Sequence, residues 1–226
     1  MNLDKQNIET LKKSIIFRGI NEKDIISMMS CLSAQKKFYR KGTYILNQGE
    51  CIDYLCLILS GSVSIENTDI WGKRKIFSNL SSSDIFAESY ACVVNEPLMV
   101  DAVATSDCEI LTINMNKIIT TCPSACSFHN FLIKNMLSVF AMKNISFTRK
   151  LEHITQKNTR EKVLSYLNYI SSKNNSTSFE IPFNREQLAD YLSVDRSALS
   201  SELSRMKSDG LISFKKNKFT INIDKE

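Results

Sequence analysis

The sequence predicts an α+β fold in which an N-terminal β-roll (jelly roll) is followed by a long helix and a C-terminal winged helix-turn-helix. Short β-branched and aromatic runs separated by Gly and Ser occupy residues 34–114, which is typical of antiparallel strands. A segment without internal Gly or Pro follows, and then two short helical patterns and a hairpin pattern. We therefore place the domains at residues 1–122, 123–154 and 155–226.

Glycines mark the ends of the strands predicted in the first domain. Gly42 and Gly49 flank one strand, and residues 54–66 form two strands separated by a turn at Gly61.

The long helix is predicted to begin at Pro123 and to run to about residue 154. One set of positions within it recurs at alternating steps of four and three, which is a heptad seam: Cys126, Asn130, Ile133, Leu137, Phe140, Asn144, Phe147, Leu151 and Ile154. A second apolar stripe is expected to pack on the β-roll: Phe128, Phe131, Leu132, Met136, Val139 and Met142. Two apolar faces indicate one face for the protein's own core and one for a second copy. The alternative is one wide buried face.

Two helices near the C-terminus have well-marked ends. Asn184 and Gln187 form a predicted capping box for the first helix, whose apolar stripe is Leu188, Ala189 and Leu192. Asp195 is placed to cap the second helix, and Gly210 to end it in a left-handed conformation. The buried face of the second helix is expected to be Ala198, Leu199, Leu203 and Met206.

The outer face of the second helix is polar. Five of its residues are of types that contact base edges and phosphates in a major groove: Arg196, Ser197, Ser200, Ser201 and Arg205. The hairpin that follows has a basic tip, predicted as a wing that contacts phosphates: Lys215, Lys216 and Lys218. These patterns predict a double-stranded DNA partner. The alternative is an ordinary pair of small helices with a glycine stop.

Charge and hydropathy are compatible with this prediction without demonstrating it. The net charge is +5, and residues 155–226 hold 12 Lys and Arg against 9 Asp and Glu, an excess of +3. No stretch approaches the roughly 20 apolar residues of a membrane helix, and the N-terminus lacks the pattern of a signal peptide. We expect a cytoplasmic protein with no membrane partner.

Seven cysteines are scattered along the chain, at positions 31, 51, 56, 92, 108, 122 and 126. Their odd number and wide spacing argue against a disulfide framework, and no pair has a zinc-ribbon spacing. We expect no metal site and interpret most of these cysteines as small core residues. The alternative is a thiol, haem or iron–sulfur sensor.

One combination of motifs resembles a known family. Lys41-Gly42, Gly49-Glu50 and an apolar strand ending in Ser60-Gly61 are similar to the β-roll of the Crp/Fnr family, the cyclic-AMP receptor protein and the fumarate–nitrate reduction regulator. The resemblance continues through the long helix and the C-terminal helix-turn-helix.

This resemblance implies a cyclic-nucleotide-binding-like β-roll and a homodimer formed along the long helix, with Ile133, Leu137, Phe140, Asn144, Phe147 and Leu151 at the interface. It also implies an inverted-repeat operator with half-sites roughly 34–36 Å apart, and contact with RNA polymerase if the protein is an activator. Arg196 stands where the family has an Arg that contacts guanine. Ser197 and Ser201 depart from the common Glu and Arg, so the half-site should differ from that of the cyclic-AMP receptor.

Relatives that bind a cyclic nucleotide hold its phosphate with a Gly-Glu turn and an Arg-Ser pair. Here the corresponding residues are Ala87-Glu88 and Leu98-Met99, residues 75–148 contain no Arg, and Lys117 is the only Lys between residues 76 and 133. A buried phosphate needs a matched cation, so we expect an effector other than cyclic AMP. The effector pocket is predicted at Phe86, Glu88, Leu98, Met99, His129, Leu132 and Met136.

No cofactor is expected. The fumarate–nitrate branch carries a cysteine cluster ahead of the β-roll, whereas this chain has only Cys31 before residue 51, which argues against an iron–sulfur cluster. Haem is the alternative, with His129, or a Cys or Met near the cavity, as an axial ligand. A small apolar or anionic metabolite, or no ligand, is equally open. The six Gly residues form no phosphate-binding loop and no catalytic signature is found, so the chain is not expected to be an enzyme. The remaining alternative is a ligand-sensing module that acts through protein contacts.

Overall fold

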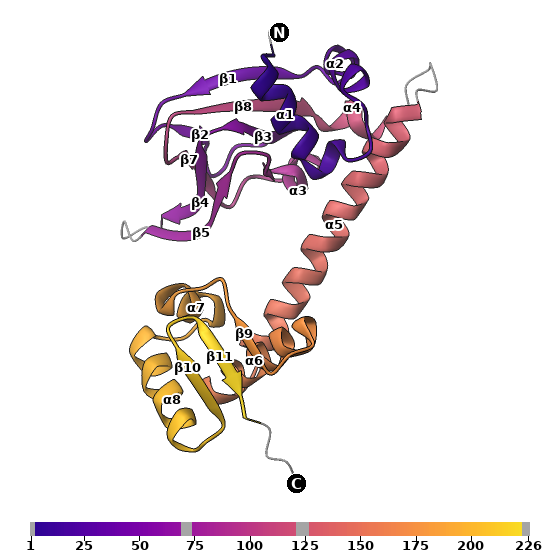
Figure 1. Ribbon diagram of the computed structural model, residues 1–226. Coiled ribbons are helices and arrows are strands. Elements are labelled where there is room, and N and C mark those ends of the chain that lie inside the picture. Colours follow the sequence, from indigo (N-terminus) through magenta and orange to yellow (C-terminus); the bar gives the residue numbers. More distant parts are fainter. Residues whose placement is uncertain (1–2, 69–73, 121–126, 223–226) are drawn as a thin grey trace. The chain divides into compact units, whose positions relative to one another are not determined.

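The computed structural model describes residues 3–68, 74–120 and 127–222 (Figure 1). The chain divides into two compact units, Met1–Ala141 and Met142–Glu226. The long helix α5, Ser127–Ile154, contributes its first half to one unit and its second half to the other. Pro123 and Cys126, at the predicted start of this helix, lie outside the described residues. The predicted α+β class is confirmed.

The first unit is a β-roll covered by helices. Its helices besides α5 are α1 (Lys5–Lys13), α2 (Glu22–Cys31), α3 (Glu88–Ala91) and α4 (Met115–Ile119), with a 3₁₀ turn at Ile15–Phe17. Its strands are β1 (Gln35–Tyr39), β2 (Tyr44–Leu46), β3 (Tyr54–Ser60), β4 (Ser62–Thr68), β5 (Arg74–Ser81), β6 (Ile85–Phe86), β7 (Asp101–Ala104) and β8 (Cys108–Asn114). They form two antiparallel sheets, in the orders β1-β8-β3-β6 and β2-β7-β4-β5.

The turn at Gly61 passes the chain from one sheet to the other. β3 and β4 are consecutive in sequence, yet β3 pairs with β6 and β8 while β4 pairs with β5 and β7. Gly61 has φ of +85°, and a Cβ there would lie 2.6 Å from the Cβ of Cys108. Glycine is therefore required both by the backbone conformation and by the close approach of Cys108 at the start of β8.

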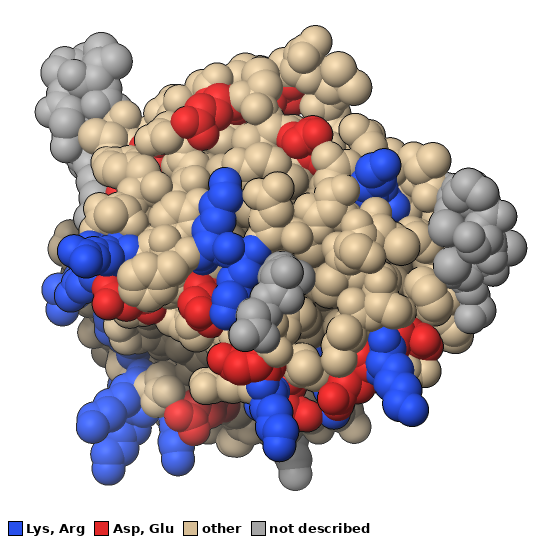
Figure 2. Space-filling model, turned by 90° about the horizontal axis from the view of Figure 1, so that it is seen from above, with Lys and Arg blue, Asp and Glu red and all other residues tan. Residues whose placement is uncertain are grey.

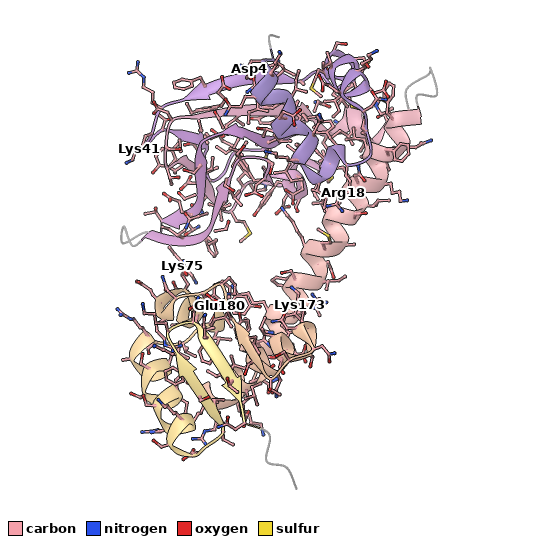
Figure 3. All side chains as sticks on the ribbon, in the orientation of Figure 1. Asp4, Arg18, Lys41, Lys75, Lys173 and Glu180 are labelled. Atoms are coloured by element: carbon pink, nitrogen blue, oxygen red, sulfur yellow. The ribbon has the colours of Figure 1, made fainter. Side chains whose placement is uncertain are left out.

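β3 is apolar from Leu55 to Leu59 because both of its faces are buried there. Leu55, Leu57 and Leu59 face a core shared with the helices, whereas Cys56 and Ile58 face a second core between the two sheets. Side chains fill the space inside the roll (Figure 3). A strand covered on both sides reads as an unbroken apolar run instead of an alternating one.

The second unit contains α6 (Thr159–Asn174), β9 (Ser178–Glu180), α7 (Arg185–Leu192), α8 (Arg196–Ser208), β10 (Ile212–Lys215) and β11 (Lys218–Ile221). The predicted hairpin is confirmed as β10 and β11. β9, which we did not predict, adds a third strand in the order β10-β11-β9.

The capping features predicted for α7 and α8 are confirmed with one exception, the cap of α8. The capping box of Asn184 and Gln187 is present, and Gly210 has φ of +75° beyond the end of α8. Asp195 occupies the N-cap position of α8, but its side chain makes no capping hydrogen bond. Ala198, expected in the buried face, is exposed, because the first turn of α8 extends beyond the core that Leu199, Leu203 and Met206 enter.

Candidate nucleic-acid interface

The outer face of α8 is free of the domain core. Arg196, Ser197, Ser200 and Ser201 are exposed, and the Arg205 side chain is 73% exposed. Leu199, Leu203 and Met206 bury the opposite face against α6, α7 and the small sheet. The structure thus brings all five predicted helix residues onto one accessible surface.

The predicted wing residues are also exposed at the tip of the hairpin. Lys215 and Lys218 are cross-strand partners, and Lys216 takes a left-handed φ of +56° in the turn between them. Lys218 lies near Glu180 of β9, with 4.0 Å between the charged atoms. An ion pair this long and exposed leaves the ammonium group available to phosphate.

Arg185, which we did not single out, holds the wing against α7. Its guanidinium carbon lies 4.6 Å from the ring centre of Phe214 and 5.1 Å from that of Phe219, and Nη2 donates to the Lys216 carbonyl at 3.2 Å. Burial lowers the pKa of Arg185 from its ordinary value. Its place directly after the Asn184 cap gave no sign of contacts with strands thirty residues away.

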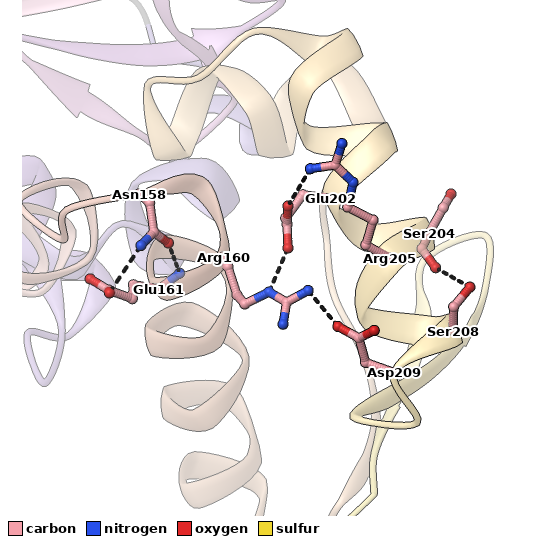
Figure 4. A network of polar contacts seen from close by, with 8 residues as sticks. All are labelled: Asn158, Arg160, Glu161, Glu202, Ser204, Arg205, Ser208 and Asp209. Carbon is pink, nitrogen blue, oxygen red and sulfur yellow. Dashed lines mark hydrogen bonds and ion pairs between the residues drawn. The ribbon is translucent and has the colours of Figure 1, made fainter.

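Arg160 of α6 makes a second unpredicted set of contacts, with α8 (Figure 4). Its Nε donates to Glu202 Oε1 at 2.6 Å, and its Nη2 donates to Asp209 Oδ2 at 2.5 Å. Hydrogen bonds to Glu202 and then to Asp209 raise the pKa of Arg160 above its ordinary value. The other oxygen of Glu202 lies 3.7 Å from Nη1 of Arg205.

The two stripes predicted on α5 differ in burial. Leu132, Met136 and Val139 are buried in the helix-side core of the first unit. On the heptad seam, Leu137, Phe147 and Leu151 are 65%, 68% and 45% exposed. A single wide buried face is therefore wrong. Phe131 and Met142, which we expected to pack inward, are exposed as well.

The remaining described residues of the seam differ in exposure. Ile133, Phe140 and Ile154 are half-buried, and Phe140 also packs against the helix-side core. Asn130 and Asn144 are exposed. The described part of the seam is therefore a largely apolar stripe open on one side of the helix.

The residues of the predicted effector pocket do not gather at one site. Phe86 and Leu98 belong to the core between the sheets, whereas Leu132 and Met136 belong to the core beside the helices. Met99 is 66% exposed.

The segment expected at the phosphate turn has a left-handed residue that is not glycine. Ala87 has φ of +66°, a left-handed conformation that is uncommon for a residue with a Cβ. The next residue, Glu88, is buried and accepts a hydrogen bond from the Ser89 hydroxyl at 3.1 Å. Leu98 is tied by its backbone to Gly49 at 2.8 Å and to Glu50 at 2.9 Å.

His129 is 4% exposed, near the start of α5. Its Nε2 lies 3.2 Å from the Lys117 carbonyl oxygen, which fixes that nitrogen as the donor. Nδ1 has no hydrogen-bond partner among the described residues. An axial bond from Nε2 to haem would break the contact with Lys117, so the described surroundings of His129 do not fit that role.

The cysteine prediction is only partly right. Cys56 and Cys108 are buried, and burial raises the pKa of both thiols. Cys31, Cys51 and Cys92 are exposed, since they lie in the helix end and loops around the roll, and Cys122 and Cys126 lie outside the described residues. Within the described ranges no three His, Cys, Asp or Glu residues are grouped as metal ligands would be.

Two surface features bear on partners. On the face drawn in Figure 2, Lys and Arg are interspersed with Asp and Glu, and no large area of one sign stands out.

Among the helices in the described part of the chain, none has the length and apolar character needed to cross a membrane.

The two units match two family models. Residues 36–123 match the cyclic nucleotide-binding domain, and residues 161–225 match the Crp-like helix-turn-helix domain. A cyclic-nucleotide-binding-like domain followed by a DNA-binding helix-turn-helix defines a transcription regulator, and not an enzyme.

Known proteins are similar to this chain over most of its length. It is 23% identical over 208 residues to the transcriptional activator protein FnrL of Cereibacter sphaeroides, covering 84% of this chain and 78% of that one. The catabolite activator protein of Thermus thermophilus has the same fold, with a TM-score of 0.55, 19% identity, and coverage of 92% and 94%. So does the c-di-GMP responsive regulator CLP of Xanthomonas campestris, with a TM-score of 0.58, 15% identity, and coverage of 90% and 100%. The chain belongs to the Crp/Fnr family.

A buried histidine lies near the C-terminal end of α5, within the second unit. His153 is 1% exposed, and the rings of Tyr166, Tyr169 and Tyr191 lie 5.7, 5.7 and 6.2 Å from its ring centre. Nδ1 lies 2.8 Å from the Ser165 hydroxyl, and Nε2 has no partner in the described ranges. Desolvation lowers the pKa of His153, opposed only by the charge of Glu152.

This site predicts a pH dependence for the second unit. A histidine whose pKa is lower folded than unfolded contributes stability above its unfolded pKa of about 6.5 and loses it as the pH falls. Amide exchange in α6 and α7, corrected for intrinsic rates, should therefore show less protection at about pH 5.5 than at pH 7.5. His153→Gln should abolish this dependence and His129→Gln should retain it. Equal protection of the wild type at both pH values would contradict the assignment.

Proposed function

We propose that this Crp/Fnr regulator binds an inverted-repeat operator as a homodimer and that its effector is not cyclic AMP. The observation that carries the DNA-binding part is the free polar face of α8, with Arg196 in its first turn and the basic wing beside it in the same domain. The N-terminal residues of a recognition helix contact base edges, and an Arg there forms a bidentate pair with guanine.

Dimerisation is supported by the exposed seam of α5. Leu137, Phe147 and Leu151 expose large apolar side chains at heptad spacing. Burying the exposed part of each against a second helix contributes about 1 kcal/mol or more, since full burial of such a side chain contributes about 1.5–3 kcal/mol. A twofold pair also doubles the number of bases contacted. Half-sites would then lie about one helical turn of DNA apart.

The effector proposal rests on the interior of the β-roll. The core between the sheets is formed, among the described residues, by apolar side chains such as Ile58, Phe86 and Leu98. Leu98 is buried where relatives that bind cyclic nucleotides place Arg, and no Arg occurs in residues 75–148. A phosphodiester taken into this interior would leave a desolvation cost of several kcal/mol uncompensated.

Two alternatives stay open within this proposal. Haem binding would give a visible absorbance band in freshly purified protein, and its absence would remove that option. A module that works through protein contacts would show no preferred DNA sequence. If the regulator is an activator, RNA polymerase is its further partner, and we expect it to act in the cytoplasm.

Arg196→Ala should weaken binding to the operator by about 1–3 kcal/mol and relax the preference at one base pair in each half-site, because the bidentate guanine contact is lost. Lys216→Ala is the comparison. This variant should weaken binding to all DNA sequences equally and reduce the salt dependence of binding, as loss of a phosphate contact does. Fluorescence anisotropy on single-base operator variants measures both. An unchanged sequence preference in Arg196→Ala would show that α8 is not the reading helix.

Leu137→Asp and Phe147→Asp should both yield monomers, because each places an unpaired charge in the dimer seam at a cost of several kcal/mol. Both side chains are exposed in the single chain, so folding should be preserved. Ser138→Asp adds the same charge next to Leu137 but off the seam, and it should stay dimeric. Sedimentation velocity reports the state. Dimers of either seam variant at micromolar concentration would place the partner surface elsewhere.

Cyclic AMP and cyclic GMP should not bind at concentrations up to about millimolar, the weak limit corresponding to roughly 4 kcal/mol of binding free energy. Isothermal titration calorimetry measures this directly. Operator binding with and without nucleotide gives an independent reading. Saturable micromolar binding would contradict the proposal and would point to a cation supplied by the second subunit.

A further inference from the structure

Glu202 of α8 lies between two arginines that it does not hold equally. Arg160 of α6 donates to Oε1 at 2.6 Å, whereas Nη1 of Arg205 lies 3.7 Å from Oε2 (Figure 4). The first distance is that of a strong charge-assisted hydrogen bond and the second exceeds any hydrogen-bond length. The Glu202 carboxylate is therefore committed to Arg160 and only loosely associated with Arg205.

Burial makes this commitment necessary. The Glu202 side chain is 14% exposed, so its charge needs a close partner. The Arg205 side chain is 73% exposed and can be solvated by water. If Arg160 were absent, the nearest cation for Glu202 would be Arg205, three residues further along the same helix, where side chains meet.

A second carboxylate fixes the direction in which Arg160 points. Its Nη2 donates to Asp209 Oδ2 at 2.5 Å. Glu202 and Asp209 lie about two turns apart on the same side of α8. A planar guanidinium that donates to both has little rotational freedom, so Nε stays directed at Glu202.

We propose that Arg160 is a positioning residue that keeps Arg205 available to DNA by occupying Glu202. This inference rests on the proposed role of α8 as the recognition helix. Arg205 stands nine residues, about two and a half turns, after Arg196 at the base-reading start of α8, so its contact is with the phosphate backbone. Removing Arg160 redirects Arg205 to Glu202 and withdraws it from the phosphate.

The test measures how binding to labelled mixed-sequence duplex DNA depends on salt. A plot of the logarithm of the binding constant against the logarithm of the salt concentration falls with a steepness set by the number of phosphate contacts. Arg160→Gln should make this plot shallower by about one unit of slope for each half-site, as Arg205→Ala should, since each variant loses one phosphate contact. The Arg160→Gln/Arg205→Ala double variant should lose no more than either single variant. Removing the competing carboxylate, in Arg160→Gln/Glu202→Gln, should restore the slope.

Arg160→Gln/Asp209→Asn is the matched control. It has the same net charge as the restored variant but leaves Glu202 ionised, so its slope should stay low. Restoration in both double variants would mean that only net charge matters, and restoration in neither, with folded protein by circular dichroism, would mean a purely structural link. Both results would overturn the inference.

Two further measurements keep the inference testable if a double variant fails to fold. DNA binding by Glu202→Gln alone should depend on salt at least as steeply as binding by the wild type, and a shallower dependence would count against the inference. A crystal structure of Arg160→Gln without DNA should show Arg205 within hydrogen-bond distance of Glu202; Arg205 turned away would overturn it. Sequence-specific binding is tested separately by Arg196→Ala, so loss of specificity does not alter these readings.

Discussion

The surface that this protein offers to DNA depends on the burial of one side of α8. Leu199, Leu203 and Met206 are fully enclosed, and together they contribute roughly 4–9 kcal/mol of apolar burial. This packing turns the opposite side of the helix outward. Arg160 adds hydrogen bonds to Glu202 and Asp209, which join α6 to the side of α8 and the residue that follows it.

α5 follows the same logic in the first unit. One stripe, with Leu132 and Met136, is consumed by the domain's own core, and a neighbouring stripe, with Leu137, is left open. A helix with two apolar sides can contribute one side to the domain core and leave the other for association with a second chain. The interior of the roll differs, because Ile58 and Leu98 belong to a buried apolar core between its two sheets.

Most local signals in the sequence were confirmed, apart from the Asp195 cap and the burial of Ala198, and long-range contacts were not visible in it. The capping box at Asn184, the stop at Gly210 and the basic hairpin were predicted because each depends on residues only a few positions apart. The contact of Arg160 with Glu202 joins residues 42 positions apart, and no periodicity marks it. The pocket prediction grouped Leu98 with Leu132 by analogy with the family, but β3 and its sheet separate their two cores.

If two copies of this chain bind DNA as a symmetric pair, the purified full-length protein should select a symmetric sequence from random duplex DNA. We expect enrichment of an inverted repeat whose half-sites are centred about 10–10.5 base pairs apart, with a guanine in each half-site facing Arg196. Enrichment of a single unrepeated site, or of no sequence at all, would contradict it.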